Sequence, residues 1–434
     1  MSDLTVGLFG FGIMLALMIA RMPIAVAMAI VGFGGIAWLS SLPVAVSAVR
    51  LGPFDRASSY SLGMIPLFLL MAFAAARGQM GQGLFRVANL WLGHLRGGLA
   101  MATVGSCAGF SAICGSSIAT AGAMTSIAYP EMVRARYHPS MSAGVIAAGA
   151  TLGIMIPPSV ILVLYGIITE QSIGRLLMAG IVPGIIESLL FLVAIAAIVR
   201  FAPELAPRAA NAVAWRDRLR GLGALWDIGL LFGIVVGGIY FGIVTPMESA
   251  SLGAAAAVLF GLLRRTLPGA ELREALIQSA TLSAMIFLIV IGADLFGTFI
   301  ALSQLPTRLA LAIADLNVPP FVVLWLIIGV YIVLGALMDE LSMILLTIPV
   351  FFPLITSLGY DPVWFGIIVV IVAQIGMITP PLGINVFIVA GIVKTVPVPA
   401  VFRGVLPFLV AQIMLALLLT LWPSIALFLP NRMF

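Results

Sequence analysis

The stretches "GIMIPP" at residues 153–158 and "GMITPP" at residues 376–381 each contain two adjacent prolines, with three residues between a glycine and the first proline. Both stretches lie inside long apolar segments. A proline in a helix interior removes a backbone hydrogen bond and clashes with the preceding turn, at a cost of roughly 3 kcal/mol or more. Two adjacent prolines therefore predict a break in each of two helices.

The composition predicts an all-α polytopic membrane protein. The chain has 434 residues, of which 62% are hydrophobic and only 9% are charged, whereas a soluble domain has about 25% charged residues. Uncharged runs such as 5–20 and 324–338 approach the length that crosses a bilayer. The net charge of +5 is typical of loop arginines that set membrane topology, not of a nucleic-acid surface.

Two apolar segments, 97–130 and 319–353, are interrupted near their middle by polar residues, "CGSSIAT" at 114–120 and "MDELS" at 338–342. Each piece is short for a full span, so we expect two re-entrant hairpins that enter and leave on one side. The broken helices are predicted at 140–169 and 362–393. A polar linker at 201–224 divides the chain into comparable halves.

The two halves are related by an internal repeat with a shift of 223 residues. This shift aligns residues 137–163 with 360–386 without gaps, and it matches Tyr137 with Tyr360 and both Gly-x-x-x-Pro-Pro stretches with each other. Matched tyrosine, glycine and paired prolines in one register are not expected from apolar composition alone. The expected division is 1–56 for N-terminal scaffold helices, 57–200 for the first repeat and 225–434 for the second.

Arginine placement predicts that the two repeats point in opposite directions. The loops around the first hairpin carry five arginines, whereas those around the second carry Arg308 with Asp315 and Asp361. By the positive-inside rule the base of the first hairpin is cytoplasmic and that of the second is outside. We expect the chain to cross the membrane five times between the two hairpins, and an odd number of crossings gives the same inverted topology. Ten crossings and two hairpins then place both termini on the periplasmic side.

Inverted repeats with discontinuous helices are typical of secondary transporters, whose sites lie near the midplane of the bilayer. A Pro-Pro break frees backbone carbonyl oxygens, and a glycine lets a cation approach them closely. Hydroxyl and carboxyl groups at the hairpin tips complete an oxygen cage suited to Na⁺. The residues predicted for cation binding are Ser116, Ser117, Gly153, Pro157, Asp339, Ser342, Gly376, Thr379 and Pro380. Those predicted to face substrate are Thr120, Ser159, Glu340 and Asn385.

The remaining polar residues suggest structural roles. We expect Glu248 to cap the helix that follows it or to bond to a neighbouring helix, and Asp294 and Glu187 to be buried partners of other side chains. Cys107 and Cys114 are interpreted as small buried residues. The sequence contains no nucleotide-binding loop, paired-histidine metal motif or nucleophile elbow, so we expect neither an enzyme nor a bound cofactor.

Five stretches resemble the large membrane subunit of TRAP (tripartite ATP-independent periplasmic) transporters, which is a DctM-like family. They are "SAICGSSIATAGAMTSIAYPEM" (111–132), "GIMIPPS" (153–159), "GIVTPMESA" (242–250), "GALMDELSMILLTIPVFFPL" (335–354) and "GMITPPLGINVF" (376–387). The resemblance covers nearly the whole chain. One departure is "TPMESAS" at 245–251, where the family more often has "TPTEAAA"; the glutamate is kept.

The resemblance implies a sodium-driven elevator in the bacterial inner membrane that imports an organic acid such as a C4-dicarboxylate, sialic acid or another sugar acid. It places Ser116, Ser117, Gly153 and Pro157 around one sodium ion and Asp339, Gly376, Thr379 and Pro380 around another. It also implies two partners, a small four-helix membrane subunit and a periplasmic substrate-binding protein. The alternative is a self-sufficient ion-coupled anion symporter or antiporter with the same hairpin architecture.

Overall fold

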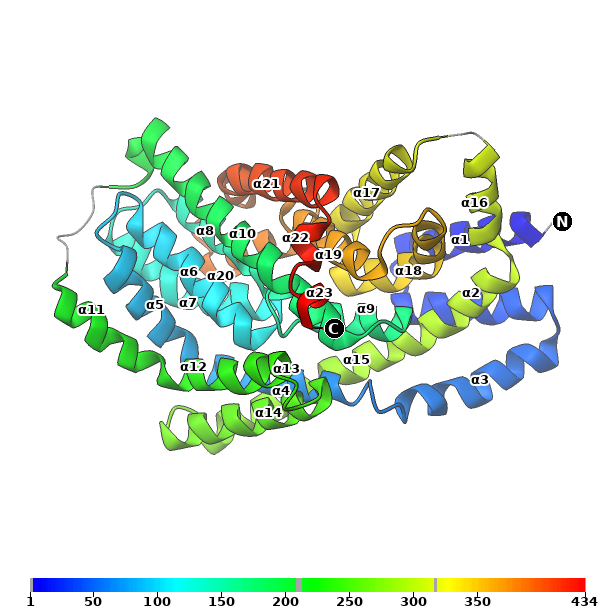
Figure 1. Cartoon of the computed structure of the whole chain (residues 1–434), viewed down its shortest axis with the longest axis horizontal. Coiled ribbons are helices and arrows are strands. Elements are labelled where there is room, and N and C mark those ends of the chain that lie inside the picture. Colours follow the sequence, from blue (N-terminus) through cyan, green and yellow to red (C-terminus); the bar gives the residue numbers. More distant parts are fainter. Residues whose placement is uncertain (1–2, 208–212, 316–317, 434) are drawn as a thin grey trace.

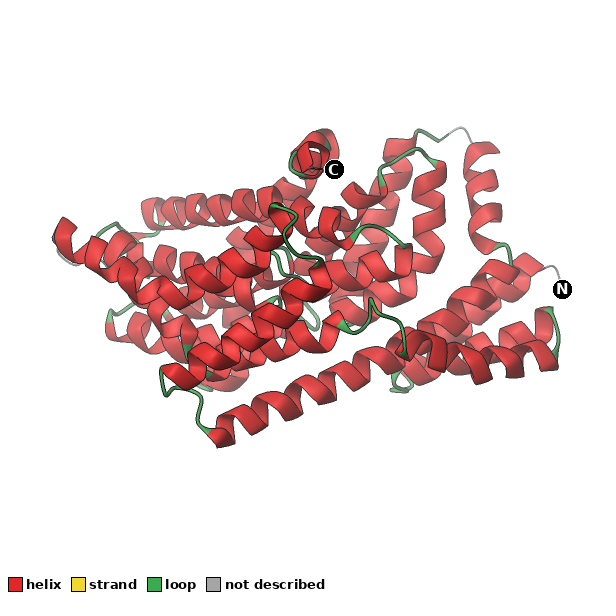
Figure 2. Cartoon of the chain, turned by 60° about the horizontal axis from the view of Figure 1, so that its bottom comes forward, coloured by secondary structure: helices red, strands yellow, loops and turns green. Residues whose placement is uncertain are grey.

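The chain folds as an assembly of helices, as its composition predicts. The computed structural model describes residues 3–207, 213–315 and 318–433, and these contain α-helices, short 3-10 turns and one π segment, with no strand among them (Figure 2). The predicted linker at 201–224 lies partly outside the described residues.

Five helices precede the first hairpin. They are α1 (Asp3–Ile19), α2 (Ile24–Leu39), α3 (Leu42–Ala57), α4 (Met64–Arg77) and α5 (Met80–Leu92). The chain bends by 64° between α4 and α5.

The first repeat contains the predicted hairpin and the predicted broken helix. The hairpin helices are α6 (Gly98–Cys114) and α7 (Ser117–Arg134). The broken helix consists of α8 (Pro139–Thr151), the 3-10 turn η1 (Leu152–Ile154) and α9 (Val160–Thr169), and α10 (Ile173–Phe201) follows it.

The middle of the chain connects the repeats. Its elements are η2 (Pro203–Leu205), α11 (Trp215–Leu222), η3 (Gly223–Leu225), α12 (Trp226–Phe232), the π segment η4 (Gly233–Gly237), α13 (Gly238–Tyr240), α14 (Pro246–Leu263), α15 (Gly269–Leu302) and α16 (Leu305–Asp315).

The second repeat has the same order of elements. Its hairpin is α17 (Pro320–Leu337) and α18 (Glu340–Ser357), its broken helix is α19 (Pro362–Ile378) and α20 (Ile384–Val393), and it ends with α21 (Val398–Leu421), α22 (Ser424–Leu427) and α23 (Pro430–Met433). Both broken helices begin with proline at the first helical position, where its missing N–H costs nothing.

The elements form an elongated body (Figure 1). Helices α5, α6, α7 and α8 lie at one end, α1, α2, α3 and α16 lie at the other, and α14, α4 and α15 run along the lower edge between them. Helix α15 crosses α2 so closely that a β-carbon at Gly32 would lie 2.6 Å from the Leu295 carbonyl carbon. Glycine is therefore required at this crossing.

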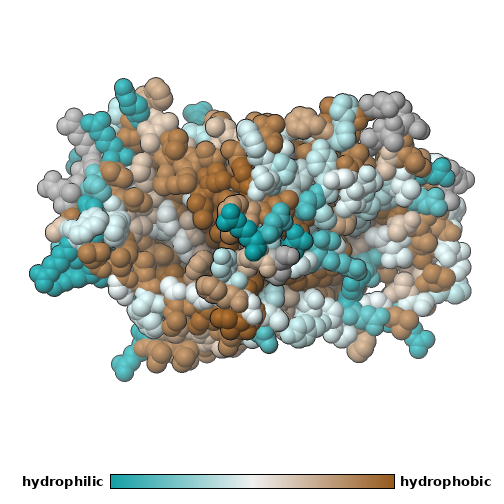
Figure 3. Space-filling model, viewed as in Figure 1, coloured by the Kyte–Doolittle hydropathy of each residue, from teal (hydrophilic) through white to brown (hydrophobic). Residues whose placement is uncertain are grey.

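Seven described helices are long and apolar enough to cross a bilayer, or eight if the bent α4–α5 pair is one span. The seven include both helices of the second hairpin, α17 and α18, which have 18 residues each; the expectation that both pieces of this segment are too short for a span was therefore wrong. The helices α1, α2, α6, α8, α9, α19 and α20 are shorter apolar helices. Hydrophobic side chains cover much of the face seen in Figure 3, and hydrophilic ones gather over α11 at its left edge. These features are those of a polytopic membrane protein.

Four described helices of eight or more residues were not predicted from apolar segments: α3, α5, α16 and α11, which lies in the predicted polar linker. Each is short or carries polar residues along its length, and α5 is strongly amphipathic, with Leu84, Phe85 and Val87 buried on one side. A search for spanning runs does not detect helices of this kind, because only one face of such a helix is apolar.

Candidate functional site

The first break lies between α8 and α9, as "GIMIPP" predicts. Pro157 and Pro158 have no N–H, so the carbonyl oxygens of Gly153 and Ile154 lose their helical donors. The Ser159 hydroxyl replaces the donor for Ile154 with a 2.6 Å hydrogen bond, and it accepts one from the Leu162 N–H at 3.3 Å. The Gly153 carbonyl oxygen is therefore the group that the prolines release.

The tip of the first hairpin packs directly on this break. A β-carbon at Gly153 would lie 2.7 Å from the Ser116 carbonyl oxygen and 2.9 Å from the Ser117 nitrogen. Gly115 has a φ of +59°, and a β-carbon there would lie 2.2 Å from the Pro158 carbonyl oxygen. Backbone thus meets backbone, with glycine on both sides of the contact.

Three predicted hydroxyls lie at this tip. The Ser116 hydroxyl accepts a hydrogen bond from the Ala119 N–H at 3.4 Å and caps α7. Thr120 donates to the Ser116 carbonyl oxygen at 2.8 Å, and both Ser117 and Thr120 are fully buried. The first break and the first tip therefore bring Ser116, Ser117, Thr120 and Gly153 together.

The second break lies between α19 and α20. Pro380 and Pro381 remove the helical donors for the carbonyl oxygens of Gly376 and Met377. The Thr379 N–H donates to the Gly376 carbonyl oxygen at 3.2 Å, and the Thr379 hydroxyl donates to the Ile375 carbonyl oxygen at 2.6 Å. The peptide bond between the two prolines is cis in both copies.

The two breaks differ at the position that follows the prolines. Ser159 satisfies the Ile154 carbonyl in the first copy, but the equivalent residue in the second copy is Leu382, which has no hydroxyl. The second copy therefore leaves the Met377 carbonyl oxygen without this substitute donor.

The tip of the second hairpin is organised by Asp339. Its carboxylate caps α18 by accepting a 3.0 Å hydrogen bond from the Ser342 N–H, and it also accepts one from the Ser342 hydroxyl. Glu340 is 7% exposed, and its Oε2 atom has no hydrogen-bond partner among the described residues.

The second break contacts a different part of its hairpin than we expected. The prediction placed Asp339 and Ser342 against the break. In the structure a β-carbon at Gly376 would lie 2.5 Å from the Gly335 carbonyl carbon, and the Leu382 N–H donates to the Ala336 carbonyl oxygen at 3.3 Å. The closest backbone contact thus falls at the end of α17, because two glycines let α17 and α19 approach each other.

Each half-helix that follows a break contacts the hairpin of the other repeat: α20 packs on α7, and α9 packs on α18. Asn385 on α20 shows this most directly, since its Nδ2 donates to the Ser117 hydroxyl at 2.6 Å and to the Ala147 carbonyl oxygen at 3.2 Å. Asn385 is fully buried, and its Oδ1 atom has no partner among the described residues.

The sequence analysis missed a cluster of buried polar side chains between the repeats. This central polar cluster consists of Thr151, Glu187, Gln374 and Gln412, from α8, α10, α19 and α21. Glutamine in the apolar runs "VVIVAQIGM" and "LVAQIML" was the available signal, because polar residues at membrane depth are functional candidates by default.

Several secondary predictions are confirmed. Glu248 forms a capping box with Thr245 at the start of α14. Glu187 is buried and accepts hydrogen bonds from two glutamines. Asp294 pairs with Arg56, but its side chain is 30% exposed and is therefore not the buried partner that we expected. Cys107 and Cys114 are buried free thiols.

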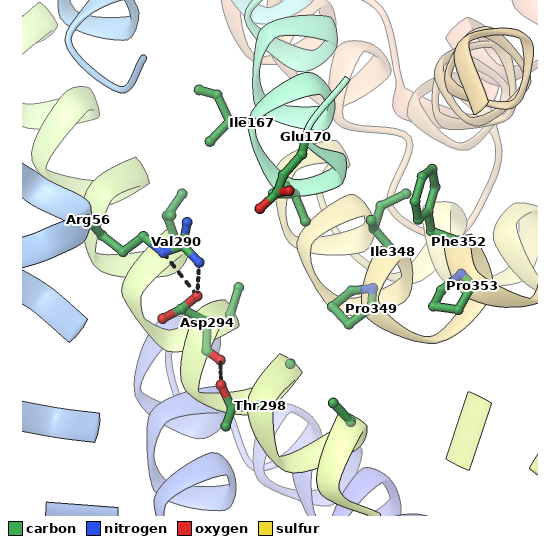
Figure 4. Close-up of a pocket in the computed structure, with 14 residues that line it drawn as sticks. Arg56, Ile167, Glu170, Val290, Asp294, Thr298, Ile348, Pro349, Phe352 and Pro353 are labelled. Carbon is green, nitrogen blue, oxygen red and sulfur yellow. Dashed lines mark hydrogen bonds and ion pairs between the residues drawn. The ribbon is translucent and has the colours of Figure 1, made fainter. Parts of the chain in front are cut away.

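A cavity of about 360 Å³ lies between α3 and α15 on one side and α9 and α18 on the other. Figure 4 shows the Arg56–Asp294 ion pair on the α15 side, with Glu170 and Pro349 across the space from it. The cavity therefore lies between α15, which belongs to the segment connecting the two repeats, and two elements close to the breaks: α9, which follows the first break, and α18 of the second hairpin.

The sequence matches the family described as "Tripartite ATP-independent periplasmic transporter, DctM component" over residues 11–425. The chain belongs to this DctM family. It is 36% identical over 399 residues to the C4-dicarboxylate TRAP transporter large permease protein DctM of Pseudomonas aeruginosa, covering 92% of each chain. The proteins of this family are transporter subunits and not enzymes, as the sequence predicts.

Two further comparisons extend this result. The DctM-family chain is 31% identical over 428 residues to the isethionate TRAP transporter permease protein DctMQ of Oleidesulfovibrio alaskensis; the match covers 96% of this chain but 65% of that protein. The solved structure of the Alcanivorax borkumensis YdaH transporter has a TM-score of 0.59 and 17% identity, with 89% of each chain covered. At that identity the likeness concerns the fold alone.

Proposed function

We propose that this DctM component imports an organic acid across the bacterial inner membrane by coupling its movement to sodium ions. The observation that carries the proposal is the pair of repeat-related breaks, each with a glycine carbonyl oxygen whose helical donor is replaced by proline. Irregular backbone at membrane depth persists only where it is buried or lines a cavity, and hard oxygen atoms suit a small cation.

The first cation site is formed by backbone carbonyl oxygens around Gly153 and Pro157, together with Ser116 and Ser117. The tip contact supports this assignment, since a β-carbon at Gly153 would lie only 2.7 Å from the Ser116 carbonyl oxygen. The second site is formed by Gly376, Thr379 and Pro380, with Asp339 supplying a negative charge and Ser342 a hydroxyl group from the neighbouring tip. The N-termini of α7 and α18 lie at these tips, and their positive dipole ends suit an anionic substrate.

The substrate is an organic acid of the C4-dicarboxylate, sialic acid or sugar acid classes. Thr120, Ser159, Glu340 and Asn385 are the residues proposed to line its path. All four are buried in the described conformation, so substrate access requires movement of the hairpins and broken helices as a transport domain against the other helices.

Two partners complete the proposed transporter. One is a small four-helix membrane subunit. The other is a periplasmic protein that delivers the substrate. Both termini of this chain are proposed to be periplasmic.

Reconstitution into proteoliposomes with these two partners tests the proposal. We expect uptake of a labelled organic acid with an inward sodium gradient and little uptake when choline replaces sodium. Uptake that does not depend on the gradient would remove the sodium coupling. Uptake by this chain alone would favour a self-sufficient symporter or antiporter instead.

A further inference from the structure

The central polar cluster is closed off from water. All four side chains, those of Thr151, Glu187, Gln374 and Gln412, have zero exposure. They come from two helices of each repeat, α8 and α10 from the first and α19 and α21 from the second. The cluster is therefore a joint between the two repeats at the centre of the protein.

The Glu187 carboxylate holds both glutamines. Gln374 Nε2 donates to Glu187 Oε2 at 3.1 Å, and Gln412 Nε2 donates to Glu187 Oε1 at 2.9 Å. Gln412 also donates to the Thr151 hydroxyl at 2.8 Å. Each of the two carboxyl oxygens accepts from one glutamine, so Glu187 fixes the position of both amide groups.

Gln374 also reaches the backbone of the other repeat. Its Nε2 donates to the Thr151 carbonyl oxygen at 2.9 Å. Thr151 is the last residue of α8 and stands two residues before Gly153, and Gln374 stands two residues before Gly376. One side chain thus connects the helical turns that lead into both breaks.

Two polar atoms of the cluster are left without a hydrogen bond. The Oε1 atoms of Gln374 and Gln412 are both buried without a hydrogen-bond partner among the described residues. An unsatisfied buried polar group is costly, so breaking a further bond inside the cluster is unfavourable. A small movement of the Thr151 carbonyl therefore moves Gln374, and with it the turn before Gly376.

We propose that Gln374 is a positioning residue that couples the two cation sites, so that occupancy of one break raises the cation affinity of the other. This inference rests on the proposed function, because it requires a cation at each break. Glu187 holds the Gln374 amide in the orientation that makes the link. Coupling of this kind is a free energy shared by the two sites and acts equally in both directions.

Equilibrium binding of radioactive sodium to the purified full-length chain tests the coupling. For the wild type we expect a Hill coefficient above one, with an upper limit of about two set by two sites. Gln374→Met keeps the length of the side chain and removes both of its hydrogen bonds. We expect this variant to bind two ions with a Hill coefficient of about one.

The matched control is Trp364→Phe, on the same helix. Trp364 Nε1 donates to the Leu419 carbonyl oxygen at 2.8 Å, so this substitution also removes a buried tertiary hydrogen bond from α19, but far from both breaks. We expect it to lower the unfolding temperature and to keep the wild-type Hill coefficient. A general loosening of α19 would lower the coefficient in both variants and overturn the specific role of Gln374.

Two outcomes separate the inference from the proposed function. A wild-type coefficient of one, or an equally steep curve for Gln374→Met, overturns the coupling and leaves sodium binding intact. A wild type that binds no sodium overturns both. Should Gln374→Met fail to fold, Glu187→Gln replaces one of the two acceptor oxygens that hold the glutamine amides and is expected to lower the coefficient; an unchanged coefficient in that variant overturns the inference.

Discussion

The side-chain amide of Gln374 donates a 2.9 Å hydrogen bond to the main-chain carbonyl oxygen of Thr151, and these residues lie 223 positions apart, which is the distance of the internal repeat. Equivalent residues of two inverted copies come into contact only where the copies meet at their shared axis. The contact therefore lies at the centre of the repeat interface. Both breaks begin two residues further along the chain, so they lie on either side of this centre.

The glycines of the two breaks are expected to tolerate no side chain. A methyl group at Gly153 or Gly376 would lie 2.7 Å or less from main-chain atoms of Ser116 or Gly335, and overpacking of this kind costs about 1–3 kcal/mol. We expect Gly153→Ala and Gly376→Ala to lower the unfolding temperature and to abolish sodium-driven uptake.

Gly122 on α7 and Gly329 on α17 are the matched controls, because a β-carbon at either position meets nothing within 4 Å. Alanine at these two positions is expected to leave uptake and stability near wild type. Because alanine favours the helix more than glycine does, equal losses in all four variants would show that the losses at Gly153 and Gly376 do not come from their close contacts.

Asp339 is expected to affect sodium dependence as well as stability. Asp339→Ala removes the cap of α18 and a negative charge at the tip, so we expect a loss of about 0.5–2 kcal/mol and a higher sodium concentration for half-maximal uptake. Asp361→Ala removes the cap of α19 at its outer end, where the carboxylate accepts from the Val363 and Trp364 N–H groups. This control is expected to lose stability alone; a wild-type sodium dependence for Asp339→Ala removes Asp339 from the site.

The Asn385–Ser117 hydrogen bond is expected to stabilise the contact between the two repeats. Its length is 2.6 Å and both residues are fully buried. Asn385→Val leaves a buried hydroxyl without its donor, which costs about 1–3 kcal/mol. We expect a double-mutant cycle with Ser117→Ala to give a coupling energy of about 0.5–3 kcal/mol from the unfolding temperatures. Additive effects would show that the bond contributes nothing of its own.

Cysteine labelling is expected to show opposite orientations for the two repeats. Arg136→Cys and Tyr360→Cys each place a thiol beside the base of one hairpin. The native Cys107 and Cys114 are at most 1% exposed, so they add little background. A membrane-impermeant thiol reagent applied to intact cells should label the cysteine at position 360 and, only after the membrane is opened, the one at position 136. Labelling of both from the same side refutes the inverted topology.

The sequence alone determined the class of protein, the two hairpins and the two breaks. These features depend on local chemistry: a shortage of charge, prolines that lack an N–H, and polar residues that interrupt apolar runs. The paired "GIMIPP" and "GMITPP" stretches could be aligned because a repeat keeps its turn residues in register. Helices such as α5 were not predicted from the sequence, because only one of their faces is apolar.

The tertiary structure decided which groups meet. Because each half-helix after a break packs on the hairpin of the other repeat, Asn385 lies beside Ser117. The close approach of α17 and α19 places the second break against Gly335 instead of Asp339. The joint of Glu187 with Gln374 and Gln412 likewise depends on four helices that are distant in the chain. No local pattern specifies such contacts, because they arise from the packing of whole helices against one another, and a residue's spacing along its own helix does not define its neighbours on the next.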